Sequence, residues 1–97
     1  MTECASGALK KSDAEMAVAL NELLAAIDAE DRKFVTEAQD AWTTYRDKEC
    51  IARIGGSPNR GGTIWPMLHL ECRAGLATLR TKDMKEQAVC PGGRLDC

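Results

Sequence analysis

Apolar residues recur at helical spacing in the first third of the chain. They lie at offsets of 0, 4, 7, 8 and 11 residues and are Met16, Leu20, Leu23, Leu24 and Ile27. This spacing places all of them on one face of a helix. A capping box at Ser12 and Glu15 would begin the helix there, but the residues before it also tolerate helix, so it can begin as early as Glu3. We expect a helix over residues 3–27.

A second apolar stripe follows a short acidic break. Asp28 suits the N-cap of the next helix, because its side chain can accept a bond from a free backbone N–H. The stripe consists of Val35, Ala38, Trp42, Tyr45 and either Glu49 or Cys50. It predicts that Trp42 and Tyr45 are core residues of a helix over 29–54. Residues 55–62 contain four glycines and a proline, which predicts a loop because neither residue type favours a helix interior.

The third stripe runs through the second half of the chain. It consists of Ile64, Leu68, Cys72, Leu76 and Leu79 and continues toward Met84. Thr63 suits the N-cap, and Pro66 is tolerated because backbone N–H groups in the first turn of a helix lack intrahelical partners. The proline and glycines after Cys90 end the helix. We expect a helix over residues 63–88 and a tail over 89–97.

Three amphipathic helices, joined by a short connection and a longer glycine loop, predict an all-α fold. We expect one domain over residues 1–97, an elongated antiparallel three-helix bundle stabilised by disulfides. At about 1.5 Å per residue, helices of about 25 residues are roughly 35–40 Å long. The composition agrees, because alanine, leucine, glutamate and lysine are plentiful while aromatic residues make up only 4%.

Net charge and the single histidine exclude several classes of function. The 97 residues carry a formal net charge of −2, whereas a nucleic-acid binder usually carries a basic stripe. No apolar run is long enough to span a bilayer. His69 is the one histidine, so neither a zinc site nor a Ser–His–Asp set is assembled with ordinary spacing. We therefore expect no catalytic activity, no metal, no cofactor, no nucleic-acid partner and no transmembrane segment.

Five cysteines point to an oxidising compartment. They are Cys4, Cys50, Cys72, Cys90 and Cys97, and none forms a Cys-x-x-Cys pair. This density is typical of disulfide-bonded proteins rather than of reduced cytosolic ones. The chain opens without the basic and apolar regions of a signal peptide. We expect a periplasmic or secreted protein whose signal peptide or lipoprotein leader is not part of this sequence.

One motif resembles a known family. It reads Ala38-Gln39-x-x-Trp42-x-x-Tyr45-Arg46-Asp47-x-x-Cys50, followed by Gly61-Gly62-Thr63-Ile64, Cys72, Leu76 and Leu79-Arg80-Thr81. Cys4 and Asp13 fall at matching positions upstream. The chain, from Cys4 to about Met84, resembles the LprI-like lysozyme-inhibitor N-terminal domain family of bacterial envelope and secreted proteins. The resemblance implies a small, disulfide-stabilised, exported helical domain and, in the name-giving member, inhibition of host lysozyme. Relatives often carry a further cysteine ahead of the position of Cys4, which this sequence lacks.

The cysteine positions favour one bridge over the others. Cys50 and Cys72 flank the glycine loop on consecutive antiparallel helices, which brings them to similar heights, so we expect a disulfide between them. Cys90 and Cys97 are the next most favoured pair, because the proline and glycines between them allow a turn. Cys4 can pair with Cys97 only if the tail folds back. The fifth cysteine is then free or links two chains.

Two arginines lie beside the predicted apolar stripes. A partly buried Arg46 or Arg80 needs a carboxylate or helix-end carbonyl groups, and Asp13 is the candidate partner through a bidentate bond. We interpret these three residues, together with Gln39 and Trp42, as structural. Removing one charge should destabilise the fold strongly, because its partner would stay buried and unpaired.

The glycine loop offers a candidate contact surface for a protein partner. Lysozymes are usually basic, and their cleft carries two carboxyl groups. Arg60 would pair with such carboxylates, and Ser57 or Asn59 would form hydrogen bonds there. The acidic chain would also be drawn weakly toward a basic enzyme. The alternative for this loop is a plain connector without a partner.

The second functional hypothesis is an envelope interaction or structural module that does not inhibit lysozyme. An exposed apolar patch beyond the core would favour it, as would a Cys4 bridge between two chains. The sequence leaves open whether the protein is a monomer or a dimer.

Overall fold

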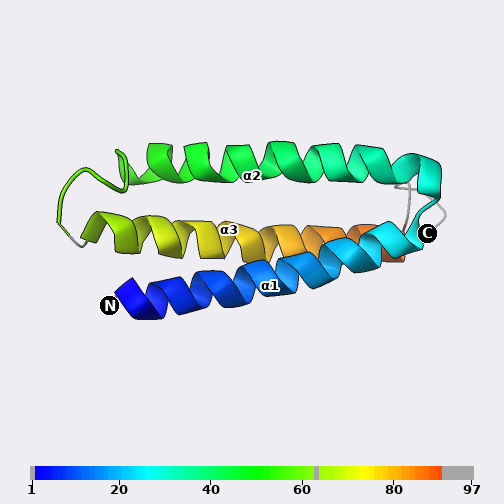
Figure 1. Ribbon diagram of the computed structural model, residues 1–97, viewed down its shortest axis with the longest axis horizontal. Coiled ribbons are helices and arrows are strands. Elements are labelled where there is room, and N and C mark those ends of the chain that lie inside the picture. Colours follow the sequence, from blue (N-terminus) through cyan, green and yellow to red (C-terminus); the bar gives the residue numbers. More distant parts are fainter. Residues whose placement is uncertain (1, 63, 91–97) are drawn as a thin grey trace.

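The computed structural model describes residues 2–62 and 64–90, and these form three long helices (Figure 1). The elements are α1 Thr2–Ala26, a 3₁₀ turn η1 Ala29–Asp31, α2 Arg32–Ile54 and α3 Ile64–Val89. The helices run up, down and up, so α2 is antiparallel to the other two. The molecule measures 49 × 22 × 21 Å. The expectation of an elongated all-α bundle is confirmed, and no strand occurs within the described residues.

The helix starts differ from the local signals in the sequence. α1 begins at Thr2, one residue before the expected Glu3, so Ser12 lies inside the helix and the alternative start at the capping box is not used. Ser12 Oγ instead donates to the carbonyl of Leu9 at 3.1 Å. Asp28 makes no side-chain cap bond; its carbonyl accepts from the N–H of Asp31 at 2.9 Å. The tight turn η1 thus takes the place of the first turn expected for the second helix.

α1 and α3 form the tightly packed pair of the bundle. They approach each other far more closely than α2 approaches either (Figure 1). The buried positions of α1 include small residues at intervals of seven, namely Ala5, Ser12 and Ala19. Small side chains let two helix backbones approach, because the interaxial distance depends on the side chains at the contact. The core cluster consists of Met16, Ala19, Leu23, Ala77 and Met84.

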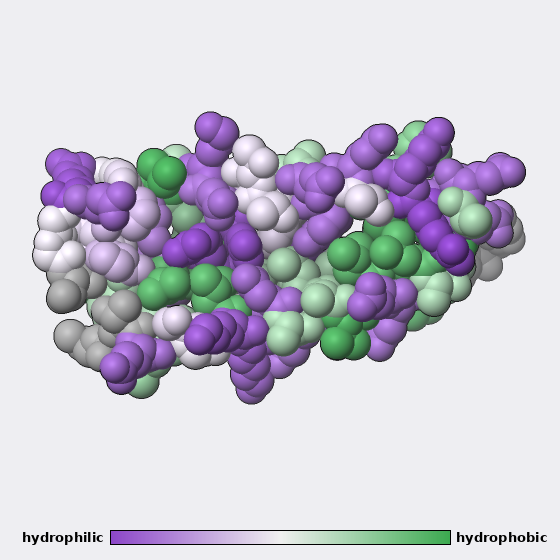
Figure 2. Space-filling view, viewed as in Figure 1, coloured by the Kyte–Doolittle hydropathy of each residue, from purple (hydrophilic) through white to green (hydrophobic). Residues whose placement is uncertain are grey.

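α2 buries a different kind of residue. Its buried side chains are those of Gln39, Arg46 and Cys50, of which two are polar. Trp42 and Val35 are half-buried and pack against the edge of the core cluster. On the face shown in Figure 2, hydrophilic side chains dominate along α2, while most of the strongly apolar colour lies over α1 and α3. α2 therefore completes the bundle mainly through long polar side chains.

Four residues of the predicted apolar stripes, Ala38 among them, are exposed instead. Tyr45 is 49% exposed, Ile64 48% and Leu79 59%. Tyr45 directly precedes the buried Arg46. Successive residues of a helix are about 100° apart, so the two side chains cannot share a face. α3 buries the rows through His69 and Leu76 and through Ala77 and Met84, and Leu79 lies outside both. The predicted stripes of α2 and α3 were therefore rotated away from the true core face.

No helix in the described part of the chain is both long and apolar enough to cross a membrane.

Candidate functional site

The loop between α2 and α3 begins with a fixed change of chain direction. Gly55 takes the left-handed conformation, with φ 82° and ψ 31°, which only glycine adopts without a steric penalty. Its N–H donates to the carbonyl of Ile51 at 3.0 Å, and that of Gly56 donates to the same oxygen at 3.1 Å. The carbonyl of Ile51 in the last turn of α2 is therefore satisfied twice, and the loop leaves the helix in one defined direction.

Ser57 to Arg60 form a closed turn at the end of the bundle. The N–H of Arg60 donates to the carbonyl of Ser57 at 3.1 Å. The N–H of Asn59 donates to Ser57 Oγ at 3.2 Å. Pro58 stands at the second position of the turn, where its fixed φ is favourable. The three residues predicted to contact a partner thus lie together in one tight turn, and all of them are exposed.

Arg60 folds back over the base of this turn. Its Nη1 donates to the carbonyl of Gly55, and its guanidinium lies 5.2 Å from the ring centre of Trp65 in the first turn of α3. A Cβ atom built on Gly56 would stand 2.8 Å from Arg60 Cδ, so a side chain there would displace the arginine. Arg60 consequently joins the two ends of the loop, which the sequence did not reveal.

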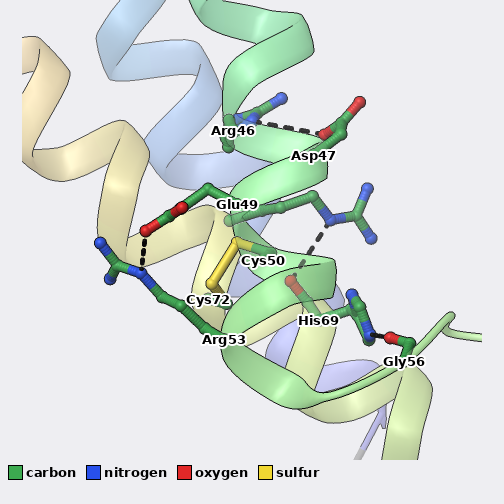
Figure 3. Close-up of a disulfide and its surroundings, with 9 residues drawn as sticks. Arg46, Asp47, Glu49, Cys50, Arg53, Gly56, His69 and Cys72 are labelled. Atoms are coloured by element: carbon green, nitrogen blue, oxygen red, sulfur yellow. Dashed lines mark hydrogen bonds and ion pairs between the residues drawn. A yellow bond between two sulfur atoms is a disulfide. The ribbon is translucent and has the colours of Figure 1, made fainter.

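His69, on α3, holds the loop through a hydrogen bond to its backbone. Its side chain is buried, at 2% exposure, and Nε2 lies 2.6 Å from the carbonyl oxygen of Gly56 (Figure 3). Because a carbonyl only accepts hydrogen bonds, Nε2 carries the proton of this contact. The sequence pattern alone assigned no role to His69. Its spacing of seven residues from Leu76 was the signal that it lies on the buried face of α3.

The predicted disulfide between Cys50 and Cys72 is confirmed. It joins α2 and α3 beside the loop, with the Cα atoms 5.8 Å apart (Figure 3). An ion pair between Glu49 and Arg53 lies on α2 near this bridge, with Nε and Oε2 2.8 Å apart. The hydrogen bond that Arg53 donates to Glu49, opposed by a smaller desolvation effect, raises the pKa of Arg53 above its ordinary value. The loop is therefore held by a covalent bridge, a buried histidine and a folded-back arginine.

A small cleft lies between this loop and the two helices. Its volume is about 210 Å³, and its lining residues are Asp47, Ile51, Pro58, His69 and Arg73. The Arg73 Nε atom donates to the main-chain carbonyl of His69 at 3.3 Å. Asp47 Oδ1 stands 3.8 Å from Arg46 Nε, which has no hydrogen-bond partner. The cleft thus has apolar walls with one charge of each sign, directly beside the loop.

The five polar and aromatic residues interpreted as structural come together in the middle of the bundle. Arg46 Nη1 donates to Asp13 Oδ1 at 2.7 Å, which joins α2 to α1. The Arg46 side chain is 9% exposed and that of Asp13 38% exposed. The Arg46 guanidinium also lies 5.1 Å from the ring centre of Trp42. One oxygen of Asp13 makes this contact, rather than the bidentate pair we expected.

Arg80 reaches the same cluster from α3. Its Nε donates to Gln39 Oε1 at 2.9 Å, and its guanidinium lies 6.0 Å from the ring centre of Trp42. The amide of Gln39 completes the set, with Nε2 3.5 Å from Met16 Sδ on α1. Arg80 therefore finds an amide oxygen and not the carboxylate of Asp13. Side chains from all three helices meet around one tryptophan, and we call Asp13, Gln39, Trp42, Arg46 and Arg80 the polar seam.

The remaining predicted positions divide into described and undescribed ones. Cys4 is an exposed free thiol. Cys97 lies outside the described residues, so the expected pair of Cys90 and Cys97 stays a prediction, and Thr63, the expected N-cap of α3, lies outside them as well. No group of His, Cys, Asp and Glu that could hold a metal ion occurs among residues 2–62 and 64–90.

Comparison with known proteins identifies the family. The family model for the lysozyme inhibitor LprI matches residues 1–84. The chain is also similar to an uncharacterized protein of Rhizobium meliloti, with 32% identity over 96 residues that cover 86% of this chain and 68% of the relative. The chain belongs to the LprI lysozyme inhibitor family. No solved structure matches it closely enough to add a comparison of folds.

Proposed function

We propose that this member of the LprI family is exported and inhibits a lysozyme by placing the loop over residues 55–62 against the substrate cleft of the enzyme. Membership of a family named for lysozyme inhibition supports the choice of partner. The disulfide between Cys50 and Cys72 supports an oxidising compartment. The family name describes an inhibitor, which agrees with the expectation that the chain is not an enzyme.

The observation that carries this proposal is the fixed geometry of the loop. Binding costs free energy when a flexible segment must be ordered, and a segment already held in shape avoids much of that cost. Here Gly55, Arg60 and His69 hold the turn from three sides. A plain connector would not need a buried histidine and a stacked arginine to define its shape.

The turn offers hydrogen-bond donors for a cleft that carries carboxylates. The side-chain amide of Asn59 has no hydrogen-bond partner within the described part of the chain and faces solvent. Arg60 uses one guanidinium nitrogen to hold the loop, and its other N–H groups remain available. We assign Asn59 to contact with the enzyme, and Arg60 to both positioning and contact. Ser57 organises the turn through its hydroxyl group.

Lysis of a cell-wall suspension by lysozymes of several classes, with and without the protein, tests the function. We expect Asn59→Ala to weaken inhibition about tenfold, because one or two hydrogen bonds to charged groups are lost. Asn21→Ala is the matched control, since Asn21 is an exposed asparagine on α1 far from the loop. Equal potency of both variants would reject the loop model. Failure of the unmodified protein against every lysozyme class would reject the function.

A second candidate function is association through another surface, as expected of an envelope interaction module. The exposed aromatic residues Phe34 and Tyr45 on α2 favour it, because they lie outside both the core and the loop. This function does not compete for the loop, so one protein can have both.

A further inference from the structure

α2 carries an exposed apolar line on a face that neither α1 nor α3 covers. The line consists of Phe34, Ala38, Ala41 and Tyr45. Phe34 is 58% exposed and Tyr45 49%, and both alanines are exposed. The positions are spaced by 4, 3 and 4 residues, which is the a/d repeat of a coiled coil. We call these four residues the outer line of α2.

The aromatic content makes this line unusual. The chain has two tryptophans, one tyrosine and one phenylalanine, so half of its aromatic side chains lie on the outer line. Single exposed hydrophobic residues are normal on protein surfaces. Two aromatic residues joined by two alanines at coiled-coil spacing form a continuous strip instead, and such a strip fits another helix.

The outer line is symmetric under reversal of the chain direction. Read from either end it is aromatic, alanine, alanine, aromatic at the same spacing. Two copies of α2 can lie antiparallel, related by a two-fold axis that crosses them at the level of Gln39 and Asp40. Phe34 of each copy then meets Tyr45 of the other. Ala38 of each then meets Ala41 of the other, and antiparallel coiled coils pair a with d positions in this way. Small residues at the centre let the two helices approach closely, and the aromatic rings close both ends.

Charges beyond the line agree with the same register. Lys48 lies three residues after Tyr45. In the antiparallel arrangement it stands opposite Asp31 and Glu30 of the other copy. Both acidic residues are exposed, as is Lys48. Glu49, next to Lys48, is already paired with Arg53 of its own helix. Opposite charges therefore meet at each end of the strip, twice in a symmetric pair.

We propose that the protein forms a two-fold symmetric dimer in which the outer lines of two α2 helices pack antiparallel. The glycine loops lie at the ends of α2, away from the axis, so both stay exposed (Figure 1). The contact is narrow, and the dimer is therefore expected to be in exchange with monomer. The proposal does not depend on lysozyme inhibition.

Sedimentation equilibrium over a wide concentration range tests it, in a Cys4→Ser background that removes disulfide exchange through the exposed thiol. We expect a reversible dimer. Ala41→Glu should raise its dissociation constant at least about tenfold, because it buries a charge beside an alanine and near the same charge of the other copy. Ala52→Glu is the matched control, since Ala52 is exposed on the same side of α2 but lies beyond the overlap. It should leave the dissociation constant unchanged.

Crosslinking tests the register. Two Ala41→Cys residues in the antiparallel pair are offset by roughly 4–5 Å along the helix axis, within reach of a short bis-maleimide. Two Ala52→Cys residues are roughly 37 Å apart along the axis and should not be linked. A protein that stays monomeric at all concentrations overturns the proposal. So does a dimer that Ala41→Glu leaves intact, or equal crosslinking of the two cysteine variants.

Discussion

α1 and α3 meet through small and aliphatic side chains, whereas α2 is joined to both through long polar ones. In the first contact, Ala19 and Ala77 are completely buried, and Leu23 and Met84 fill the space beside them. In the second, Arg46 reaches Asp13 and the Cys50–Cys72 bridge adds a covalent link. One molecule thus assembles its helices in two physically distinct ways.

The difference predicts how each contact fails. An apolar contact loses free energy in proportion to the volume and area removed, since its energy is spread over many weak contacts. A contact made of charged and amide groups depends on pairing, because removing one partner leaves the other buried without compensation. The α1–α3 contact should therefore respond to size, and the polar seam should respond to the loss of a specific partner.

The largest effect is expected in the α1–α3 contact. Leu23→Ala removes a completely buried side chain and leaves a cavity, so we expect a loss of about 3–4 kcal/mol in the free energy of unfolding. Leu79→Ala is the matched control, because Leu79 is mostly exposed, and it should cost less than about 0.5 kcal/mol. Urea denaturation followed by circular dichroism measures both. Similar losses for the two variants would contradict the assignment of the core.

The disulfide comes next. Cys50→Ser combined with Cys72→Ser opens a loop with a sequence separation of 22 residues, and the chain-entropy relation gives a loss of about 3 kcal/mol. Cys4→Ser should leave stability unchanged, because Cys4 is exposed and free. Thermal melting without reductant compares the variants. If the double serine variant has the same melting temperature as the unmodified protein, the packing of α2 on α3 does not depend on this bridge.

A substitution in the polar seam should cost less free energy of unfolding, and a second substitution should restore part of the loss. Asp13→Ala leaves the buried Arg46 without its carboxylate, and we expect a loss of about 2 kcal/mol, below the value for a fully buried pair because Asp13 is partly exposed. Adding Arg46→Met should restore part of this loss, since the uncompensated charge is then gone. A double-mutant cycle by urea denaturation measures the coupling. Additive losses would mean that the two residues do not act as a pair.

These two modes of assembly also explain which features the sequence could predict. The three helices and the Cys50–Cys72 disulfide follow from periodicity, glycine positions and cysteine spacing, which are local signals. The orientation of α2 is not local, because its docking face is set by Gln39, Arg46 and Cys50 and not by its most apolar stripe. Hydrophobic periodicity therefore placed Tyr45 in the core, although the structure exposes it.

The loop was predicted in position but not in detail. Glycine spacing located residues 55–62, whereas the contacts of Arg60 with Trp65 and of His69 with Gly56 depend on how α2 and α3 are brought together. A pattern along one chain does not contain such distances. The same reason explains why Arg80 meets Gln39 and not the expected Asp13.

The smallest prediction compares one substitution at two glycines. Gly7 lies in the interior of α1 with no atom within 4 Å of an added Cβ, and alanine favours helix over glycine, so Gly7→Ala should stabilise by about 0.5–1 kcal/mol. Gly56 has φ +155° and its Cβ would press on Arg60, so Gly56→Ala should destabilise by about 1 kcal/mol. Thermal melting gives the two signs, and the lysis assay separates them further. Because the displaced arginine no longer holds the turn, Gly56→Ala should weaken lysozyme inhibition while Gly7→Ala leaves it unchanged. Inhibition that survives Gly56→Ala would mean that the shape of this loop does not matter for binding.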